Sequence, residues 1–431
     1  MEIVDRYLKP SFFQALNQAE FRIPKNKIYS NNIYLEKIGF INSTGSLQYN
    51  SLVGALGVIK SAVLLDNGVE IDSCKNCGAL TGFKNKLRQP KRILNKLDPE
   101  KSCRTAFSFK TDVADDGTNN NTIIGPVDSE VIGTVESLTE DGIVPLDFFF
   151  PVLKSLPSVD TNLFSDLRVR LEFSSDLFDL FNVQNITTYS QIVPVIRLQE
   201  IEEPKIAASM GIKSGSYPWL AYEHDRYAFP APAAADITAA GKEQTVSVRL
   251  NGIRNKSIGR VLIQKGYATS AAATNSGDYG NLASRPLFKE KIQVRVNGSN
   301  LFAEGGLGGD KSMDILAVTT DAFGEFGLIP YESEYGSGPG TYDDTVGSWE
   351  INSYIDARRT NKGSYIGFHV QSKANDFFIE HKRTCVTGDV SAVGSLGGAN
   401  SASLSALNCN VYFEVKKNLM VQNGKYMVQY M

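Results

Sequence analysis

Two cysteines three positions apart, Cys74 and Cys77, have the spacing that many metal sites use. A structural zinc ion needs four ligands, which are usually cysteine and histidine side chains. A second pair with this spacing is missing from the sequence, so a zinc site would have to recruit Cys103 and a distant histidine. We therefore predict that Cys74 and Cys77 are reduced thiols in a loop and bind no metal.

The three histidines, His224, His369 and His381, are scattered along the chain without a recognisable motif around them. His369 lies in residues 365–370, which favour a strand, and such a histidine is more often hydrogen-bonded or solvated than a general base. Neither a G-x-S-x-G nor an H-E-x-x-H pattern occurs. A β-sandwich hydrolase would need two carboxylates facing each other across a cleft, and nothing in the sequence indicates such a pair. We predict that the protein is no enzyme and has no catalytic, cofactor-binding or metal-binding residues.

Acidic and glycine-rich stretches give weaker signals. Asp115-Asp116 and Asp343-Asp344 offer carboxylates that suit calcium, for example between neighbouring subunits, but without the EF-hand spacing. The run from Glu304 to Gly309 is not followed directly by the Lys-Ser/Thr of a P-loop, and we expect no helix after it. We expect a turn there rather than a phosphate site.

The composition limits the class of protein. A chain of 431 residues suffices for two domains, and 42% hydrophobic with 21% charged residues is typical of a globular fold. The formal charge of −3 provides no overall field that would attract phosphates, so we expect no sequence-specific binding of nucleic acid. The start of the chain lacks the pattern of an export signal, and no apolar run is long enough for a membrane-spanning helix. The chain has five cysteines, an odd number that does not indicate a set of disulfide pairs. These features predict reduced thiols and assembly inside a cell.

The periodicity of the chain is that of β-strands. Apolar and polar residues alternate over residues 167–173, 246–250 and 292–297, which places the apolar side chains on one face of each strand. Residues 412–415 continue the pattern near the C-terminus. Clusters of Gly, Asn, Asp and Pro separate these segments, as in antiparallel sheets.

Helical signals are few, with short helices predicted over residues 11–19 and 90–101. Three long stretches, residues 111–129, 331–347 and 390–408, lack a strand pattern and are expected to be loops at the ends of a sandwich. The class is therefore all-β, and the strands are too numerous for one sheet, which favours a sandwich or jelly roll.

The two halves of the chain share a weak internal repeat. Each half has three corresponding predicted strands: a first strand, a strand that ends at an Asn-Gly turn, and a last strand with strong alternation. In the first half these are residues 32–38, 59–65 and 167–173. In the second half they are residues 246–250, 292–296 and 410–415. Asn67-Gly68 and Asn297-Gly298 predict hairpins, because both turn residues accept a positive φ. We place the boundary near Pro204, which has no N–H to donate to a sheet, after a last strand over residues 192–198.

Residues 143–173 resemble a known family. The run from Ile143 to Pro151, the following Leu156-Pro157 and residues 163–173 are similar to the double jelly-roll major capsid proteins of tailless icosahedral DNA viruses. These viruses include large eukaryotic DNA viruses, virophages, polinton-like elements and membrane-containing phages. In the family, a Pro-Leu-x-Phe-x-Phe segment ends one strand of the first jelly roll. Phe148 and Phe150 are then expected on one face of a strand and Phe149 on the other, so that the strand is covered on both sides.

The resemblance implies two eight-stranded antiparallel jelly rolls in tandem, a viral major capsid protein and a homotrimer whose six jelly rolls form a pseudo-hexagonal capsomer. It implies no cofactor. The implied partners are neighbouring capsomers, penton and minor capsid proteins and an internal membrane, and the implied location is the virion, after synthesis in the host cell. The alternative is a carbohydrate-binding or receptor-binding β-sandwich, such as a spike or lectin, which would expose aromatic platforms.

The predicted organisation has four parts: an N-terminal arm over residues 1–30, a first jelly roll over 31–203, a connector over 204–245 and a second jelly roll over 246–431. The arm carries apolar anchors and Pro10, which interrupts a long helix. We expect it to serve assembly with a neighbour or a membrane, while the alternative is that it covers the base of its own jelly roll. The anchors are Val4, Tyr7, Leu8, Phe12, Phe13 and Leu16.

Overall fold

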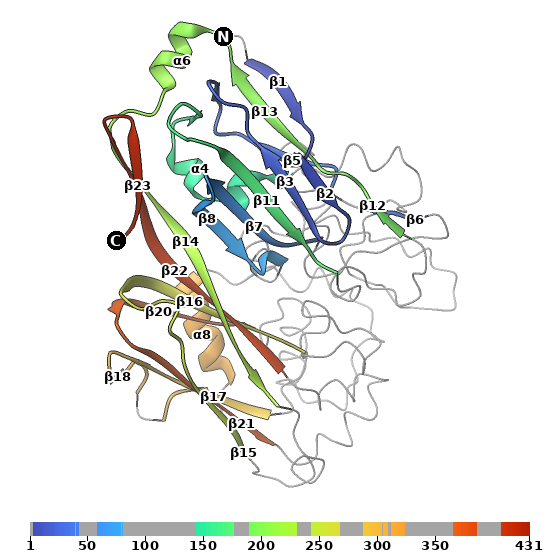
Figure 1. Ribbon diagram of the computed structural model, residues 1–431. Coiled ribbons are helices and arrows are strands. Elements are labelled where there is room, and N and C mark those ends of the chain that lie inside the picture. Colours follow the sequence, from blue (N-terminus) through green and yellow to red (C-terminus); the bar gives the residue numbers. More distant parts are fainter. Residues whose placement is uncertain are drawn as a thin grey trace, which may run out of the picture. The chain divides into compact units, whose positions relative to one another are not determined.

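The computed structural model forms two compact units (Figure 1). The residues that it describes are 3–38, 40–42, 58–78, 80, 144–175, 189–230, 243–267, 288–303, 305–308, 312–323, 365–385 and 407–431. Unit 1 contains the described residues up to Glu223 and those from Glu414 onward, and unit 2 contains those from His224 to Phe413. The chain thus passes from unit 1 to unit 2 inside one strand, β14 (Gly215–Phe229), and returns inside another, β22 (Leu407–Gln422).

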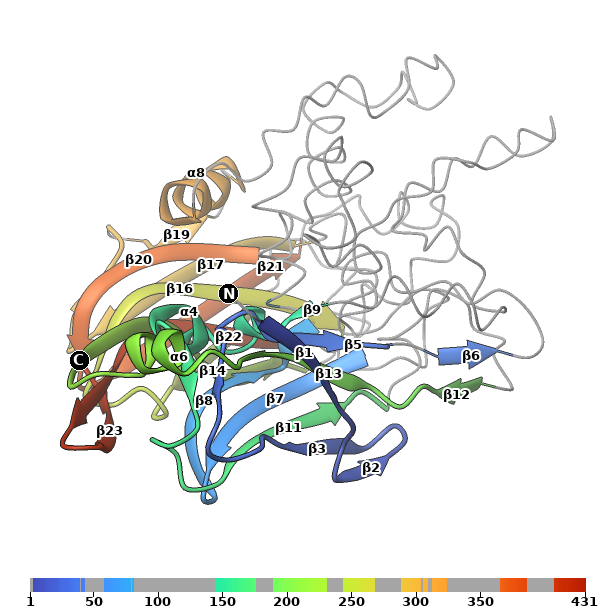
Figure 2. The same ribbon diagram turned by 90° about the horizontal axis from the view of Figure 1, so that it is seen from above.

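Unit 1 contains two antiparallel sheets built from the first half of the chain (Figure 2). One has the order β10-β4-β13-β5-β9, with β1 paired to β13; its strands are β1 (Ile3–Leu8), β4 (Ile28–Tyr29), β5 (Tyr34–Glu36), β9 (Val144–Pro145), β10 (Val159–Asp160) and β13 (Val195–Ile201). The other has the order β2-β3-β11-β7-β8; its strands are β2 (Phe12–Gln14), β3 (Gln18–Arg22), β7 (Ile59–Asp66), β8 (Val69–Lys75) and β11 (Leu167–Phe173). A separate pair joins β6 (Phe40–Asn42) to β12 (Tyr189–Gln191), and short helical segments are η2 (Leu146–Phe148), α4 (Val152–Ser155) and α6 (Pro204–Met210).

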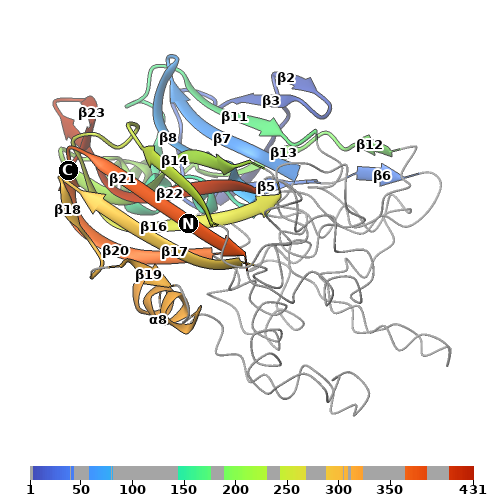
Figure 3. The same ribbon diagram turned by 90° about the horizontal axis from the view of Figure 1, so that it is seen from below.

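The second half of the chain builds two further antiparallel sheets (Figure 3). One has the order β14-β22-β16-β20 and adds β23 on β22; its other strands are β16 (Lys256–Tyr267), β20 (Tyr365–Ala374) and β23 (Lys425–Tyr430). The other has the order β15-β21-β17-β18 and adds β19 on β17; its strands are β15 (Glu243–Arg249), β17 (Phe288–Val296), β18 (Ser299–Asn300), β19 (Leu307–Gly308) and β21 (Phe377–Cys385). Helix α8 (Ser312–Phe323) lies against β20 (Figures 2 and 3).

Strand order reveals the internal repeat more clearly than the sequence does. In one sheet of each half, corresponding strands are neighbours in the same order: β1-β13-β5-β9 in the first half and β14-β22-β16-β20 in the second. Likewise, β3-β11-β7-β8 matches β15-β21-β17-β18. Two facing sheets with these orders are a jelly roll, so we call β1 to β13 the first jelly roll and β14 to β22 the second. The all-β class is confirmed, while the number of eight strands per roll stays a prediction.

The repeat was expected at partly different strands. Topology equates β11 with β21, whereas the sequence favoured residues 410–415, which lie in β22. Both patterns alternate, so the sequence alone did not separate them. The Asn-Gly turns are confirmed: Asn67 and Gly68 have φ of 48° and 82°, and Asn297 and Gly298 have φ of 53° and 82°. They close the β7–β8 and β17–β18 hairpins, which occupy equivalent places in the two rolls.

The predicted helix over residues 11–19 is wrong, while the role of residues 1–30 as an assembly arm stays a prediction. Residues 12–22 form the β2–β3 hairpin, in which Ala19 and Phe21 are fully buried. β1 pairs with β13 over six positions, from Ile3 opposite Ile201 to Leu8 opposite Ile196. The backbone of this segment therefore completes the sheets of its own subunit, whereas Tyr7 and Phe12 among the predicted anchors stay 62% and 47% exposed.

Two further expectations change. The connector over residues 204–245 contains the 15-residue strand β14, the first strand of the second jelly roll. Phe148–Phe150 do not form a strand, because the chain turns into η2 directly after Pro145. Phe149 and Phe150 are consequently both buried, and only Phe148 is partly exposed. The predicted helix over residues 90–101 and the loops over 111–129 and 331–347 lie outside the described residues.

Candidate functional site

The outer face of the sheet that contains β3 and β11 carries a run of charged side chains. Leu167, Val169 and Leu171 on β11 are at most 3% exposed, so the alternation directs Arg168 and Arg170 outward. β3 pairs with β11 so that Arg22 stands opposite Arg168 and Glu20 opposite Arg170. A row of charges on adjacent strands is close enough for cross-strand ion pairs.

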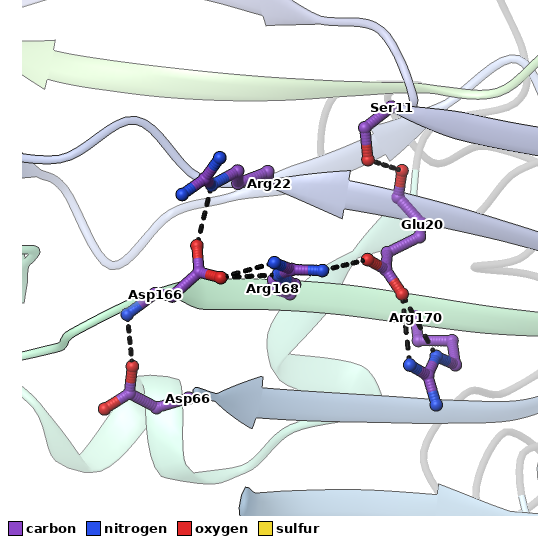
Figure 4. Close-up of polar contacts among 7 residues, drawn as sticks. All are labelled: Ser11, Glu20, Arg22, Asp66, Asp166, Arg168 and Arg170. Carbon is purple, nitrogen blue, oxygen red and sulfur yellow. Dashed lines mark hydrogen bonds and ion pairs between the residues drawn. The ribbon is translucent and has the colours of Figure 1, made fainter. Parts of the chain in front are cut away.

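These residues form a continuous chain of contacts, which we call the charged ladder: Arg22, Asp166, Arg168, Glu20 and Arg170 (Figure 4). Asp166 accepts hydrogen bonds from Nε of Arg22 at 2.7 Å and from Nε of Arg168 at 2.8 Å. Glu20 accepts one from Nη1 of Arg168 at 2.7 Å and one from Nη2 of Arg170 at 3.1 Å. Arg168 therefore joins the two carboxylates.

The ladder is fixed to the fold at both ends. The backbone N–H of Asp166 donates to Oδ1 of Asp66 at 2.6 Å, and the hydroxyl of Tyr426 on β23 donates to Oδ2 of Asp66 at 2.6 Å. At the other end, Oγ of Ser11 donates to the backbone oxygen of Glu20 at 2.9 Å (Figure 4). These two bonds fix the backbone at Asp166 and at Glu20, the residues that carry the two carboxylates of the ladder.

Electrostatics keeps both carboxylates ionised. The hydrogen bond from Arg168 lowers the pKa of Asp166. Burial raises the pKa of Glu20, but the hydrogen bonds from Arg168 and Arg170 outweigh it and leave the pKa below its usual value. Arginine forks match carboxylates and stay charged, so each arginine of the ladder keeps its carboxylate partner ionised. Its side chains remain accessible, with Arg22 60% and Arg170 42% exposed.

By sequence, the chain matches no family model and no curated protein. Its structure, however, is similar over almost the whole length to solved capsid proteins. A quasi-atomic model of the PBCV-1 virus capsid has a TM-score of 0.54 and 13% identity, covering 100% of this chain and 97% of that one. The crystal structure of the mavirus major capsid protein has a TM-score of 0.53 and 10% identity, covering 99% and 90%. The cryo-EM structure of the Sputnik virophage has a TM-score of 0.55 and 9% identity, covering 100% and 88%.

The chain has the fold of these capsid proteins. The resemblance that residues 143–173 indicated is therefore confirmed at the level of the complete fold. Both jelly rolls take part, because the alignments cover both halves of the chain.

The cysteine pair lies within the first jelly roll. Cys74 and Cys77 are buried, and Sγ of Cys77 donates to the backbone oxygen of Cys74 at 2.8 Å. Cys103, the third potential ligand, lies outside the described residues. Within the described part of the chain, no three His, Cys, Asp or Glu side chains are grouped so that they could hold a metal ion.

The histidines each have a separate structural setting in unit 2. His381 is fully buried on β21, and its Nδ1 lies 2.7 Å from the hydroxyl of Tyr227. Nε2 of His224 lies 3.0 Å from Oδ1 of Asn410, and Nε2 of His369 lies 3.3 Å from a backbone oxygen on α8. Hydrogen-bonded partners of this kind fix a ring in place.

The glycine-rich run leads into the short strand β19, and the expectation that no helix follows the run is wrong, because α8 begins at Ser312. Leu307 and Gly308 pair with Ile292 and Lys291 on β17. Gly306 has a φ of 81°, and a Cβ atom there would lie 2.6 Å from the backbone oxygen of Ile292, so the backbone approaches too closely for a side chain. The acidic pairs 115–116 and 343–344 lie outside the described residues. Among the helices of the described ranges, none is both long and apolar enough to cross a bilayer.

Sequence reasoning missed the charged ladder. Arg168 and Arg170 were placed correctly on the polar face of a strand, but the residues directly before Glu20 were predicted to form a helix, so that β3 was missed. The alternation of Gln18, Ala19, Glu20, Phe21 and Arg22 was the available signal.

Proposed function

We propose that this chain is a viral major capsid protein and that three copies form a pseudo-hexagonal capsomer of an icosahedral shell. The observation that carries the proposal is the full-length double jelly-roll fold, which matches solved capsid proteins over 88–97% of their chains. Two rolls of the same strand order in each chain would give a trimer six similar wedges, and closed symmetric assemblies of this kind are the common solution for homo-oligomers.

The charged ladder supports assembly with copies of the same chain. A rigid, accessible face with both signs of charge favours one orientation of a partner over others. We assign this face to contacts between neighbouring copies, within or between capsomers. The remaining partners in the proposal are penton and minor capsid proteins and an internal membrane, with synthesis in the host cell and final location in the virion.

The full-length chain tests the proposal directly. Light scattering coupled to gel filtration should give three times the chain mass of 47.2 kDa, and negative-stain images should show particles of hexagonal outline. Monomers at micromolar concentration that bind glycans on an array would instead favour a carbohydrate-binding sandwich and overturn the capsid proposal.

A matched pair of variants tests the assigned face. Arg170→Glu reverses a charge in the ladder, whereas Glu172→Lys reverses an exposed charge on the same strand outside it. We expect the first variant to weaken assembly and the second to leave it unchanged. If both variants assemble equally well, the ladder is not part of the contact surface.

A further inference from the structure

The C-terminal end of the chain closes on unit 1. Residues 414–431, which we call the strap, comprise the end of β22, the Asn423-Gly424 turn and β23. β22 and β23 pair from Lys417 opposite Tyr430 to Gln422 opposite Lys425, and Figure 1 shows β23 beside the C-terminus. The strap belongs to unit 1, as do β8 and the first part of β14.

A buried cation holds the strap. The side chain of Lys417 is 3% exposed, and its Nζ lies 3.0 Å from Oε1 of Glu223 on β14. The same Nζ lies 5.1 Å from the ring centre of Tyr430 on β23, whose hydroxyl donates to Oε1 of Glu223 at 2.9 Å. Three strands of unit 1 therefore meet at one ammonium group.

A fully buried carboxylate on the first jelly roll faces this ammonium. Asp72 on β8 is 0% exposed and interacts electrostatically with Lys417. It accepts hydrogen bonds from the backbone N–H of Val152 at 3.2 Å and of Ser73 at 3.0 Å. Nε1 of Trp219 on β14 is buried without a hydrogen-bond partner among the described residues, although the nearby indole lowers the pKa of Asp72. Asp72 thus has two backbone donors, and the positive charge that acts on it is that of Lys417.

We propose that closing of the strap is coupled to proton uptake by the buried Asp72–Lys417–Glu223 cluster, so that mild acid tightens the C-terminal end of the chain. In the closed strap, burial raises the pKa of Asp72 to about 6, although Lys417, the two backbone donors and the nearby indole of Trp219 act in the opposite direction. When the strap opens, water reaches Asp72, and its pKa returns toward the ordinary value of about 3.9. The closed form therefore binds more protons between these two values, and linkage makes acid favour it.

Lys417 and Tyr430 keep their protonation states in this pH window. The pKa of Lys417 is raised, although burial alone would lower it, because Glu223 and Asp72 favour the ammonium. Burial raises the pKa of Tyr430 to about 12, so its hydroxyl is neutral throughout the window. Glu223 contacts both the ammonium of Lys417 and the hydroxyl of Tyr430. A variant at Asp72 separates the contribution of Glu223 to the pH dependence from that of Asp72.

The N-terminal strand of the same unit provides an internal reference. β1 is held by Arg6, whose Nε donates to Glu200 at 2.9 Å, and Glu200 also pairs with Lys27. The hydrogen bond from Lys27 is the main cause that lowers the pKa of Glu200. Acid should therefore loosen β1 while it tightens β23, which excludes a general effect of pH on the fold.

Hydrogen exchange of the full-length chain, measured by mass spectrometry at about pH 5 and pH 7 with times corrected for intrinsic exchange, tests the coupling. Wild-type β23 should open about tenfold less at pH 5, as expected for a group with these two pKa values. Asp72→Asn should abolish this ratio. Tyr426→Phe removes the second anchor, the hydrogen bond to Asp66, and should raise opening at both pH values while the ratio persists.

Two outcomes overturn the proposal: an unchanged ratio in the wild type, or a tenfold ratio that survives in Asp72→Asn. If Asp72→Asn fails to fold, the wild-type ratio and its persistence in Tyr426→Phe decide the matter. A ratio that vanishes in Tyr426→Phe would assign the effect to Asp66 and also contradict the proposal.

Discussion

Nζ of Lys417 lies 3.0 Å from Oε1 of Glu223, although the lysine side chain is almost completely withdrawn from solvent. Lysine is rarely buried without a charge partner, because an isolated ammonium loses its hydration. Here the partner comes from β14, and Asp72 of β8 supplies a second negative charge. The ion pair thus joins the end of β22 to β14, and the charge of Asp72 on the first jelly roll acts on the same ammonium.

Lys417→Met tests the importance of this cation. The substitution keeps most of the side-chain volume but leaves the buried Asp72 without a charge partner. We expect the free energy of unfolding at about pH 8 to fall by about 3 kcal/mol, the cost of breaking a buried ion pair. Urea denaturation measures it, with the exposed neighbour Lys416→Met as the control. Equal losses in both variants would show that the buried pair has no special role.

Gly367 on β20 is the contact point for α8. A Cβ atom there would lie 2.7 Å from Cδ2 of Phe323, and the backbone N–H of Gly367 donates to Oγ1 of Thr319 at 2.8 Å. We expect Gly367→Ala to destabilise the chain by about 1–3 kcal/mol through overpacking. Urea denaturation is again the measurement, and Gly252→Ala, whose nearest contact would be 3.7 Å away, is the control.

A second substitution identifies the cause at Gly367. If the clash with Phe323 is responsible, Phe323→Ala should recover part of the loss in the Gly367→Ala background. No recovery would mean that the loss arises from the backbone rather than from the helix.

Local patterns made much of the fold predictable. The alternation of β11 is visible directly in the sequence, because each buried apolar residue is followed by a polar one. Asn67-Gly68 and Asn297-Gly298 were equally clear, since few other residue pairs accept two successive positive φ angles. The Asn423-Gly424 pair equally indicates the β22–β23 hairpin, which was not predicted.

Long-range features were not predictable in this way. The Asp72–Lys417 relationship joins residues far apart in the chain, and neither residue has a local pattern that marks it as buried. Residues 11–19 were misassigned because Phe12, Phe13 and Leu16 also fit helical spacing. The segment forms strands because β3 pairs with β11, a long-range contact that exists only in the folded chain.

The charged ladder should make stability depend on acid in the opposite sense to Asp72. The pKa values of Asp166 and Glu20 are lowered in the fold, so their contribution is present above the ordinary pKa of about 4 and is lost as pH falls through the lower folded-state values. Arg168→Gln removes the cation that the two carboxylates share. We expect the urea midpoint of this variant to fall less steeply than that of the wild type between about pH 5 and pH 3.

Glu172→Gln, on the same strand but outside the ladder, is the matched control and should keep the wild-type slope. Parallel curves for the wild type and Arg168→Gln would show that the ladder is too well screened by water to contribute.

Deleting residues 2–18 should prevent folding. The deletion removes β1, which pairs with β13 over six positions, and β2, which covers the edge of β3. It also removes Arg6, so that Glu200, which is 4% exposed, loses one of its two cations. The backbone groups of β13 would then lack partners along one edge, at a cost that a marginally stable fold does not tolerate. We expect insoluble or aggregated protein by gel filtration, while Tyr7→Ser, at a β1 side chain that is 62% exposed, should remain folded. A soluble truncated chain that forms trimers and melts at the parent temperature would contradict this expectation and support the role of the segment as an assembly arm.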